Sequence, residues 1–321
     1  MNPTGAAPTL PAKVPPSPEL LKLQLGWIGT GVMGKSMCKH LLSQGYKLLV
    51  NSRTQSKTED LIKEGAAFAS KEEIAEKCDV VFLMLGFPQD VTEVLFDQGF
   101  LVKMKKGSYL VDHTTSSPNL AEKIQLAAQE KGIHAYDAPV SGGDIGARNG
   151  QLVTMCGGSE AEFKPVAEIM RTYSKNVQLM GKTGSGQHTK MMNQIVIAGS
   201  MVGVCESLVY GYSVGLDINK VLEVIGGGAA SSYTLANLAP RVLKGDFNPG
   251  FYVEHFVKDM KIALEESHRM NIKLPGLELA HQLYTQLSNE LGLGRCGTQA
   301  LIKVLEHINK KQYTAPFKPI Q

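Results

Sequence analysis

The sequence LQLGWIGTGVMG, residues 23–34, decides the fold, because an apolar run typical of a buried strand leads directly into a Gly-x-Gly-x-x-Gly loop. In this motif Gly29 makes a tight turn, Gly31 lets the backbone approach a pyrophosphate, and Gly34 lets the following helix pack against the strand. A helix that begins here points its free N–H groups at phosphates. A glycine-rich turn without a ligand is the alternative, but the strand pattern before the motif and the helical pattern after it favour a dinucleotide site. The predicted cofactor-binding loop comprises Gly29, Thr30, Gly31, Val32, Met33 and Gly34.

Short β-rich runs alternate with helical patterns from residue 23 to about residue 180. The strands are expected at 23–28, 47–50, 80–85, 109–111, 135–138, 152–156 and 177–180, and the helices between them include 32–43, 57–64, 120–131 and 161–173. This alternation predicts an α/β fold with a Rossmann-type, doubly wound, mostly parallel sheet over residues 23–184. Beyond this point the strand-like runs stop, and long helical patterns predict an all-helical C-terminal domain over residues 185–310.

Both ends of the chain are predicted to lie outside these domains. Residues 1–22 are rich in proline and read as a disordered leader, and residues 311–321 read as an irregular tail. The leader has neither arginine nor an apolar core, so it is unlike a transit peptide or a signal peptide. The five cysteines include no Cys-x-x-Cys pair, which favours a reducing compartment and a cytoplasmic protein without a metal site.

Several classes of partner are disfavoured by composition. The net charge of +3 is small and the basic residues form no block, so we predict no nucleic-acid partner. The longest candidate membrane span, residues 191–205, has 15 uncharged residues and is too short to cross a bilayer. It also contains Asn193 and Gln194, and we predict a buried core helix and no membrane partner.

The end of the second predicted strand bears on the choice of cofactor. Proteins that bind NAD place an acidic residue about 20 residues after the glycine motif, where it meets the ribose hydroxyls. Here the residues are Ser52, Arg53 and Thr54, and a guanidinium can bind a 2′-phosphate. The sequence therefore favours NADP, with NAD possible, and the alternative for Arg53 is a solvated loop arginine.

A lone lysine at the start of the apolar helix is the candidate acid and base. Lys190 and Asn193 are three residues apart, so their side chains share one helical face. A lysine beside a nicotinamide can protonate a carbonyl oxygen as hydride arrives, and the amide of Asn193 can orient the lysine or the substrate oxygen. The alternative is a lysine that extends from the helix end into water.

Two further segments carry candidate polar groups. Ser141, Gly142 and Gly143 follow a predicted strand, and exposed N–H groups with a hydroxyl suit a carboxylate, although a plain tight turn is equally compatible. Lys258 and Asp259 interrupt an apolar helical pattern. Because adjacent residues on a helix do not face one another, we expect each to have its own partner, an exposed ion pair being the alternative.

With these residues in hand, the chain resembles the β-hydroxyacid dehydrogenase family, which includes 3-hydroxyisobutyrate dehydrogenase, tartronate semialdehyde reductase and the glyoxylate/succinic semialdehyde reductases. The likeness covers about residues 23–309. It rests on four motifs in order: GWIGTGVMG at 26–34, DAPVSGGDIGARNGQL at 137–152, GSGQHTKMMNQ at 184–194 and KDM at 258–260.

The resemblance implies a role for each matching residue. It implies that Lys190 and Asn193 are catalytic and that Ser141, Gly142, Gly143 and Asp259 bind substrate. It implies that Met84, Leu85, Thr115 and Lys258 lie by the cofactor, together with the glycine-rich loop and Ser52, Arg53 and Thr54. It also implies a homodimer or homotetramer, and it places His113 where methionine is common.

These observations predict an NADP(H)-dependent oxidoreductase that interconverts a small β-hydroxy acid and its semialdehyde, or reduces glyoxylate or succinic semialdehyde. In this scheme Lys190 gives or takes the proton, and the substrate is a small carboxylate. The alternatives are an NAD-dependent 3-hydroxyisobutyrate dehydrogenase and a non-catalytic dinucleotide-binding scaffold. The presence of both Lys190 and Asn193 argues against the scaffold.

Overall fold

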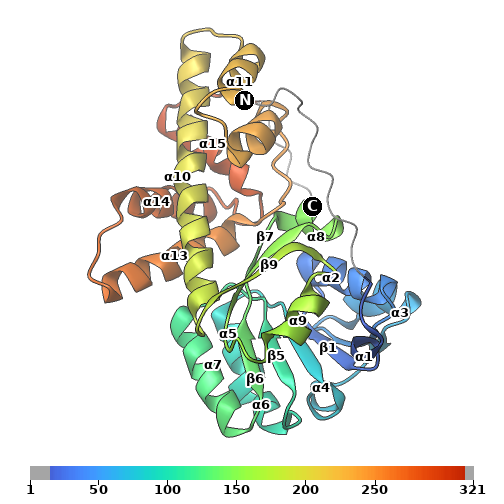
Figure 1. Cartoon of the computed structure of the whole chain (residues 1–321). Coiled ribbons are helices and arrows are strands. Elements are labelled where there is room, and N and C mark those ends of the chain that lie inside the picture. The colour runs from blue at the N-terminus through green and yellow to red at the C-terminus, as the bar shows by residue number, and fades with distance from the viewer. Residues whose placement is uncertain (1–14, 315–321) are drawn as a thin grey trace, which may run out of the picture. The chain divides into compact units, whose positions relative to one another are not determined.

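The structure is a computed structural model, and it describes residues 15–314 (Figure 1). The chain divides into two compact units, the first ending at Lys190 and the second beginning at Met191. The first unit is built on a β-sheet, and the second is helical. Most of the predicted leader, residues 1–14, and residues 315–321 of the predicted tail lie outside the described residues.

Nine strands in the described part of the chain form one sheet in the first unit. They are β1 (Gln24–Ile28), β2 (Lys47–Asn51), β3 (Ala67–Phe68), β4 (Val80–Leu83), β5 (Tyr109–Asp112), β6 (His134–Asp137), β7 (Val140–Ser141), β8 (Leu152–Gly157) and β9 (Ser174–Gly181). Their order is β3-β2-β1-β4-β5-β6-β8-β7, with β9 beside β8. The first six strands are parallel, and β8 runs antiparallel to β6 and β7. The predicted Rossmann-type, mostly parallel sheet is confirmed, since this is its strand order.

Helices cover both faces of this sheet. On β4, Val80 and Phe82 belong to the core shared with α2 (Val32–Ser43) and α9 (Phe163–Met170). Val81 and Leu83 belong to the core shared with α4 (Lys71–Lys77), α6 (Phe100–Lys103) and α7 (Pro118–Glu130). A strand buried on both faces is what helical crossovers on both sides require. The helical segments of this unit are α1 (Pro18–Leu21), α2 (Val32–Ser43), η1 (Gln55–Thr58), α3 (Glu59–Lys63), α4 (Lys71–Lys77), α5 (Pro88–Thr92), η2 (Glu93–Asp97), α6 (Phe100–Lys103), α7 (Pro118–Glu130), α8 (Gly143–Arg148) and α9 (Phe163–Met170).

Several short elements differ from the sequence-based expectation. β3 and β7 have two residues each, too few to show a periodic pattern, and α4 is specified chiefly by its capping box, in which Ser70 and Glu73 bond each other's backbone N–H. Within the segment expected to be a leader, α1 forms and buries Leu20 in the sheet core. One apolar side chain in a polar, proline-rich segment is enough to attach it to the domain.

The parallel strands end level with one another. The register pairs Ile28 at the end of β1 with Asn51 at the end of β2 and with Leu83 at the end of β4. Leu83 pairs in turn with Asp112, the last residue of β5. The loops that follow these strands therefore emerge at one edge of the sheet. In open α/β sheets, ligands bind outside this edge where the strand order reverses, which here is between β1 and β4.

The second unit is a bundle around one apolar core. α10 (Ser185–Ser213) begins in the first unit and continues into the second, where Met191, Ala198, Met201, Cys205 and Leu208 form its buried face. Spacings of three, four and seven residues are those of one helical stripe. The other helical segments are α11 (Ile218–Gly226), η3 (Thr234–Leu238), α12 (Ala239–Leu243), α13 (Val253–Arg269), α14 (Pro275–Asn289), η4 (Thr298–Leu301) and α15 (Ile302–Ile308).

α10 extends beyond both ends of the uncharged stretch at residues 191–205. It has 29 residues, and within residues 15–314 it is the one helix whose length and composition would suffice to cross a membrane. The argument that the apolar stretch is too short to span is therefore wrong. A long core helix of a soluble protein meets the same criterion, and one face of α10 does lie in the bundle core.

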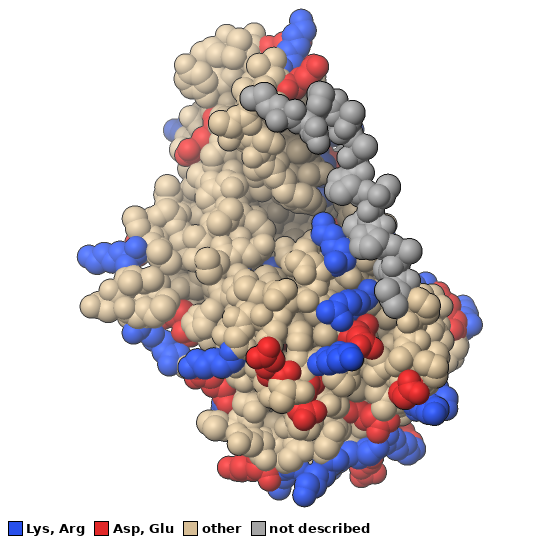
Figure 2. Space-filling model, viewed as in Figure 1, with Lys and Arg blue, Asp and Glu red and all other residues tan. Residues whose placement is uncertain are grey.

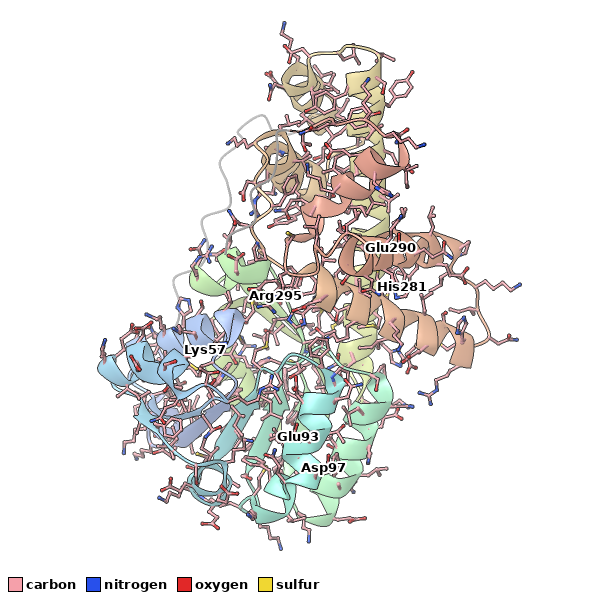
Figure 3. All side chains as sticks on the ribbon, turned by 180° about the vertical axis from the view of Figure 1, so that it is seen from behind. Lys57, Glu93, Asp97, His281, Glu290 and Arg295 are labelled. Atoms are coloured by element: carbon pink, nitrogen blue, oxygen red, sulfur yellow. The ribbon has the colours of Figure 1, made fainter. Side chains whose placement is uncertain are left out.

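The start of α13 is held by a loop from the end of the bundle. The N–H of Val253 donates to the carbonyl oxygen of Cys296, and the N–H of Glu254 donates to that of Gly294. Arg295, labelled in the rear view of Figure 3, forms an ion pair with Glu254 at 2.6 Å. These contacts fix the first turn of the helix that carries Lys258 and Asp259.

Charge on the first unit is distributed in small groups of both signs. Figure 2 shows Lys and Arg side chains interspersed with Asp and Glu side chains over this unit. The first unit also contains local ion pairs, such as Lys35–Asp60 at 3.0 Å and Lys77–Glu73 at 2.9 Å. Exposed pairs of this kind each contribute about 0–1 kcal/mol, so they affect solubility more than the fold.

Candidate active site

The three glycines of the loop after β1 meet different steric demands. Gly29 has a φ of +101°, and a Cβ there would clash with the carbonyl oxygen of Met84. A Cβ on Gly34 would clash with the carbonyl oxygen of Gly29 and lie 2.8 Å from Trp27 Nε1. Apart from the two residues adjacent in the chain, no described heavy atom lies within 4 Å of the position that a Cβ on Gly31 would take. The outer glycines therefore permit close packing, while Gly31 leaves the approach to the backbone clear for a pyrophosphate.

The N-terminus of α2 is suited to an anion. Gly31 is its N-cap, no side chain caps it, and its first turn has no acidic residue. The side chain of Thr30 is 1% exposed, and its Oγ1 has no hydrogen-bond partner within the described residues. A buried hydroxyl without a partner costs about 1–3 kcal/mol, so a ligand oxygen is the natural complement. The loop, with Val32 and Met33 in the first helical turn, thus fits the phosphates of a nicotinamide dinucleotide.

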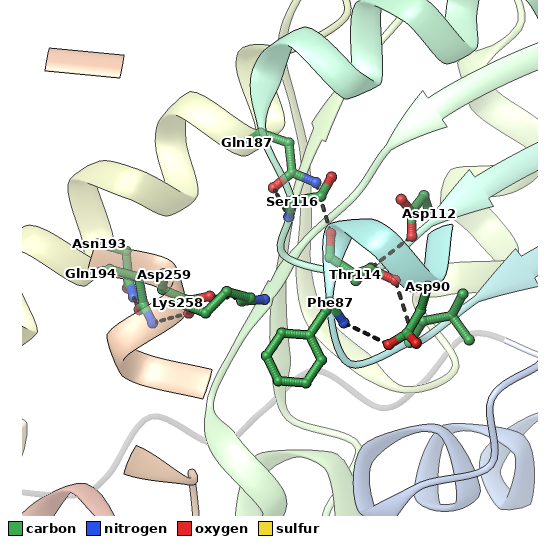
Figure 4. Close-up of polar contacts among 11 residues, drawn as sticks. Phe87, Asp90, Asp112, Thr114, Ser116, Gln187, Asn193, Gln194, Lys258 and Asp259 are labelled. Carbon is green, nitrogen blue, oxygen red and sulfur yellow. Dashed lines mark hydrogen bonds and ion pairs between the residues drawn. The ribbon is translucent and has the colours of Figure 1, made fainter. Parts of the chain in front are cut away.

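Arg53 lies directly after β2, between Ser52 and Thr54, and 79% of its side chain is exposed. Its Nη1 lies 3.1 Å from Oδ1 of Asp90 on α5. The other oxygen of Asp90 accepts a hydrogen bond from the N–H of Phe87 at 3.0 Å (Figure 4). Arg53 is thus exposed to solvent, as expected for the alternative of a solvated loop arginine. Its guanidinium is also paired with Asp90, a contact that the sequence did not indicate.

The two loops predicted to lie along the cofactor are tied to each other. The Oγ1 of Thr114, in the loop after β5, accepts a hydrogen bond from the N–H of Leu85, in the loop after β4, at 2.9 Å. The N–H of Thr114 donates to Asp112 Oδ1, also at 2.9 Å. Met84 and Thr115, two further predicted cofactor contacts, are the sequence neighbours of this bonded pair. The structure therefore gathers these residues at one edge.

Gln187, in the first turn of α10, contacts the backbone on either side of Thr115. Its Nε2 donates to the carbonyl oxygen of Thr114 at 2.8 Å, and its Oε1 accepts from the N–H of Ser116 at 3.0 Å (Figure 4). The side chain is fully buried. The amide thus joins the loop after β5 to α10.

Asp137, at the end of β6, holds the backbone of the same helical turn. Its two carboxylate oxygens accept hydrogen bonds from the N–H groups of Gly184 and Gln187, each at 2.8 Å. Burial raises the pKa of Asp137, and these N–H donors act in the opposite direction. A carboxylate at a helix N-terminus also interacts favourably with the helix dipole. Lys190 follows within one turn and is only 6% exposed, so the predicted catalytic lysine is buried rather than extended into water.

His113 lies at the centre of an aromatic cluster behind the glycine-rich loop. Its ring stacks on those of Trp27 and Phe82, with centroids 5.8 and 5.7 Å away. His113 Nδ1 lies 2.6 Å from the carbonyl oxygen of Ala138 and must therefore carry the proton, since a carbonyl only accepts. Its Nε2 then accepts from the hydroxyl of Tyr173 at 2.9 Å. Burial lowers the pKa of His113 to about 4, so the ring is neutral at physiological pH.

This histidine predicts an acid-sensitive first unit. Because the folded pKa of about 4 lies below the ordinary 6.5, the unfolded chain takes up the proton first as the pH falls. We expect stability to be lost between about pH 6.5 and pH 4, amounting to about 3 kcal/mol at about 1.4 kcal/mol per pKa unit. The measurement is urea unfolding at several pH values, followed by the fluorescence of Trp27, the single tryptophan.

The matched variant is His113→Met. It cannot titrate, and it removes the hydrogen bonds to Ala138 and Tyr173, so it is expected to be less stable than the wild type at pH 7. The difference should narrow by about 3 kcal/mol as the pH falls to about 4. A difference that stays constant over this range would show that His113 does not cause the acid sensitivity.

The loop predicted to hold the substrate carboxylate is a strand-to-helix turn. Ser141 ends β7 and pairs with Val153 on β8. Gly142 and Gly143 have φ values of +127° and +61°, which residues other than glycine rarely adopt. A Cβ on Gly142 would also lie 3.2 Å from Leu152 Cδ2. These glycines are needed for the turn itself, and carboxylate binding by this loop stays a prediction.

In the second unit, a chain of hydrogen bonds leads from the buried Asp259 of α13 to the partly buried Asn193. Gln194 Nε2 donates to Asp259 Oδ2 at 2.6 Å, and Asn193 Nδ2 donates to Gln194 Oε1 at 2.7 Å (Figure 4). Gln194 is 1% exposed and Asp259 is fully buried. A carboxylate only accepts hydrogen bonds, so Gln194 must point its NH₂ group at Asp259 and its carbonyl oxygen at Asn193. Asn193 in turn must point its NH₂ group at Gln194. Asp259 thereby sets the orientation of a predicted catalytic side chain.

Lys258 and Asp259 also pair with each other, contrary to the expectation from helical geometry, although Asp259 has a partner of its own in Gln194. Lys258 Nζ lies 3.0 Å from Asp259 Oδ1, and the two side chains are 13% and 1% exposed. Although adjacent Cβ atoms on a helix diverge, the flexible four-carbon stem of lysine lets its ammonium return to the neighbouring carboxylate. The pair is also not the exposed ion pair of the alternative, because both side chains are largely withdrawn from water.

Each unit holds part of the predicted site. The first contains the glycine-rich loop, the segments after β2, β4 and β5, the 141–143 turn and Lys190, and the second contains Asn193, Lys258 and Asp259. Sequence reasoning missed Asp90, Asp137, Gln187 and Gln194. The two glutamines lie in the GSGQHTKMMNQ motif, and an uncharged polar side chain in an apolar helix was the signal that could have revealed Gln194.

Comparison with known proteins agrees with this geometry. Residues 24–181 match the family model described as the NAD binding domain of 6-phosphogluconate dehydrogenase, and residues 184–305 match that described as NAD-binding of NADP-dependent 3-hydroxyisobutyrate dehydrogenase. A probable 3-hydroxyisobutyrate dehydrogenase-like protein 1, mitochondrial, of Arabidopsis thaliana is 50% identical over 89% of this chain and 86% of its own length. The 2-hydroxy-3-oxopropionate reductase of Escherichia coli is 33% identical over 88% of this chain and 97% of its own. The crystal structure of 3-hydroxyisobutyrate dehydrogenase from Salmonella typhimurium superimposes with a TM-score of 0.80 at 28% identity, covering 88% of this chain and all of that one.

Both halves of the chain match family models of nicotinamide-dinucleotide dehydrogenases, and the first half carries a buried lysine. The protein is therefore an NAD(P)-dependent oxidoreductase that acts on CH–OH groups. Identity above 30% over nearly the whole length narrows this class further. The chain belongs to the β-hydroxyacid dehydrogenase family.

Proposed function

We propose that this protein is an NADP(H)-dependent enzyme that interconverts a small β-hydroxy acid and its semialdehyde, or reduces glyoxylate or succinic semialdehyde. The observation that carries the proposal is the placement of Lys190. This lysine is buried within one turn of Gln187, whose backbone and side chain are bonded to the strand-edge segments at Asp137 and Thr114. The same edge of the sheet carries the glycine-rich loop.

The side chains divide the chemistry between them. When bound, the nicotinamide supplies or accepts the hydride at the carbonyl carbon. In the reductive direction Lys190 Nζ gives a proton to the carbonyl oxygen, which completes the hydroxyl group, and in the oxidative direction the neutral amine takes that proton back. Ser141, Gly142 and Gly143 hold the substrate carboxylate, and Asn193 orients the reacting oxygen. Positioning and charge stabilisation supply the remaining acceleration.

The substrate class is supported by the relatives. The Escherichia coli relative is named for 2-hydroxy-3-oxopropionate, and the Arabidopsis and Salmonella relatives for 3-hydroxyisobutyrate. Both compounds are short carboxylates with the reacting oxygen on carbon 3, counted from the carboxylate carbon. A turn that binds the carboxylate and one lysine that transfers the proton could therefore act on either compound. We therefore assign a class of substrate rather than one compound.

The test is a panel of small carbonyl acids. Initial rates of NADPH and NADH oxidation are measured with glyoxylate, succinic semialdehyde, tartronate semialdehyde and methylmalonate semialdehyde. We expect turnover of at least one compound, faster with NADPH than with NADH. Tight cofactor binding without turnover of any compound would contradict the proposed substrate class and favour the scaffold alternative.

Preference for NADPH is expected to depend on Arg53. Replacing it with alanine should raise the Kd for NADPH by about tenfold or more, since a charge-assisted hydrogen bond contributes about 1.5–3 kcal/mol. The Kd for NADH should change little, because NADH has no 2′-phosphate. Both constants can be measured by cofactor fluorescence at fixed ionic strength. Arg269→Ala, which removes an exposed arginine of α13, is the control. An unchanged ratio of the two Kd values in Arg53→Ala would exclude a role of Arg53 in binding the 2′-phosphate.

A further inference from the structure

We infer that Gln187 is a positioning residue of the active site: its amide fixes the 114–116 segment relative to the turn of α10 that carries Lys190. The inference rests on the proposed function only where its test measures kcat and KM. The contacts that support it lie within the first unit.

The first step is the geometry of the amide. Gln187 Nε2 donates to Thr114 O at 2.8 Å and Gln187 Oε1 accepts from Ser116 N–H at 3.0 Å, so one planar group bonds to both sides of Thr115 (Figure 4). The backbone N–H of Gln187 is itself held by Asp137 at 2.8 Å. Neither the helical turn nor the loop can therefore shift without breaking buried hydrogen bonds.

The second step is what these bonds connect. Thr114 also accepts a hydrogen bond from the N–H of Leu85, so the amide links α10 to both loops predicted to lie along the cofactor. Gln187 and Lys190 are three residues apart on α10, which places them on one helical face. A displacement of the loop by about 1 Å relative to the lysine can cost about 10²-fold in rate, because hydride and proton transfer require aligned groups.

The third step is the donor and acceptor pattern. The site needs one donor toward Thr114 and one acceptor toward Ser116, which a glutamine amide supplies. A glutamate anion supplies only acceptors and would oppose the Thr114 carbonyl oxygen. A protonated glutamic acid has one O–H donor and one carbonyl acceptor, and so it restores the pattern of glutamine. Burial favours the protonated form of such a group and moves its titration toward neutral pH.

The experiment compares Gln187→Glu, Gln187→Met and the surface control Gln129→Glu with the wild type. The Kd for NADPH, and kcat and KM for the substrate found in the panel, are measured from about pH 5.5 to about pH 9 and divided by the wild-type values at each pH. Thermal unfolding followed by Trp27 fluorescence establishes that each variant is folded. We expect Gln187→Met to lose about 10- to 100-fold in kcat at every pH, with a smaller change in KM.

The pH dependence distinguishes positioning from general support of the fold. Relative kcat of Gln187→Glu should be low at alkaline pH and recover toward the wild type as the pH falls, whereas Gln187→Met and Gln129→Glu should show no recovery. Parallel profiles for the two Gln187 variants, or wild-type kcat in both, would overturn the inference. If the wild-type protein turned over no compound, the proposed function would fail. The role of Gln187 would still be decided by the Kd for NADPH: recovery of affinity at acid pH in Gln187→Glu would support the role, and absence of recovery would overturn it.

Discussion

Lys190→Ala is expected to lower kcat by about 10²- to 10⁴-fold, the usual contribution of a positioned general acid or base, with little change in the Kd for NADPH. The lysine is 6% exposed and lies in the first turns of α10, whose backbone is anchored independently by Asp137. Removing its side chain should therefore leave the cofactor loop intact. Initial rates of NADPH oxidation and a fluorescence titration with NADPH measure the two quantities separately.

A second substitution separates proton transfer from simple charge stabilisation. Lys190→Arg keeps a positive charge, but a guanidinium is not deprotonated in proteins and is a poor proton donor. If Lys190 transfers the proton, Lys190→Arg should be nearly as slow as Lys190→Ala. Lys220→Ala, at a lysine whose side chain is 81% exposed on α11, is the matched control and should keep wild-type rates. Retention of most activity in Lys190→Arg would refute the proton-transfer role and leave an electrostatic one.

The parts of the site that the sequence predicted are those with local causes. The positive φ of Gly29 is a property of the turn itself, and a side chain at Gly34 would strike the carbonyl oxygen of Gly29, five residues earlier. The close approach of Met84 to Gly29 is long-range, and the sequence did not indicate it. Strand ends in a parallel sheet meet at one edge whatever their separation in the chain, so the segments after β1, β2, β4 and β5 could be grouped from the alternation of strands and helices alone.

The parts that were missed depend on long-range contacts. Gln187 and Thr114 are 73 residues apart, and Gln194 and Asp259 are 65 apart, so no spacing along the chain indicates that they bond. The pairing of Lys258 with its neighbour was missed for a different reason. The directions of the Cβ atoms on a helix are a poor guide to where the end of a long, flexible side chain lies.

The buried pair in the second unit gives the other large expected effect. Asp259→Leu removes a fully buried carboxylate and breaks its ion pair with Lys258 Nζ at 3.0 Å, in which the lysine side chain is 13% exposed. Breaking a buried ion pair in this way typically costs about 3–5 kcal/mol. Because the tryptophan lies in the first unit, loss of stability in the helical unit is best followed by far-ultraviolet circular dichroism during urea unfolding. Glu265→Leu, which breaks an exposed pair with Lys261 on the same helix, should cost about 0–1 kcal/mol.

Removing both charges separates the energetic role of the pair from its role in catalysis. Lys258→Met/Asp259→Leu removes both charges of the pair. Most of the stability lost in Asp259→Leu should return, since apolar replacement of a whole buried pair is often neutral. Turnover should stay low, because Gln194 no longer faces a carboxylate and the Asn193 amide loses the bond pattern that orients it. If turnover recovered together with stability, the pair would serve the fold alone. If stability stayed low in the double variant, loss of packing at Asp259 rather than an unpaired charge would be the cause.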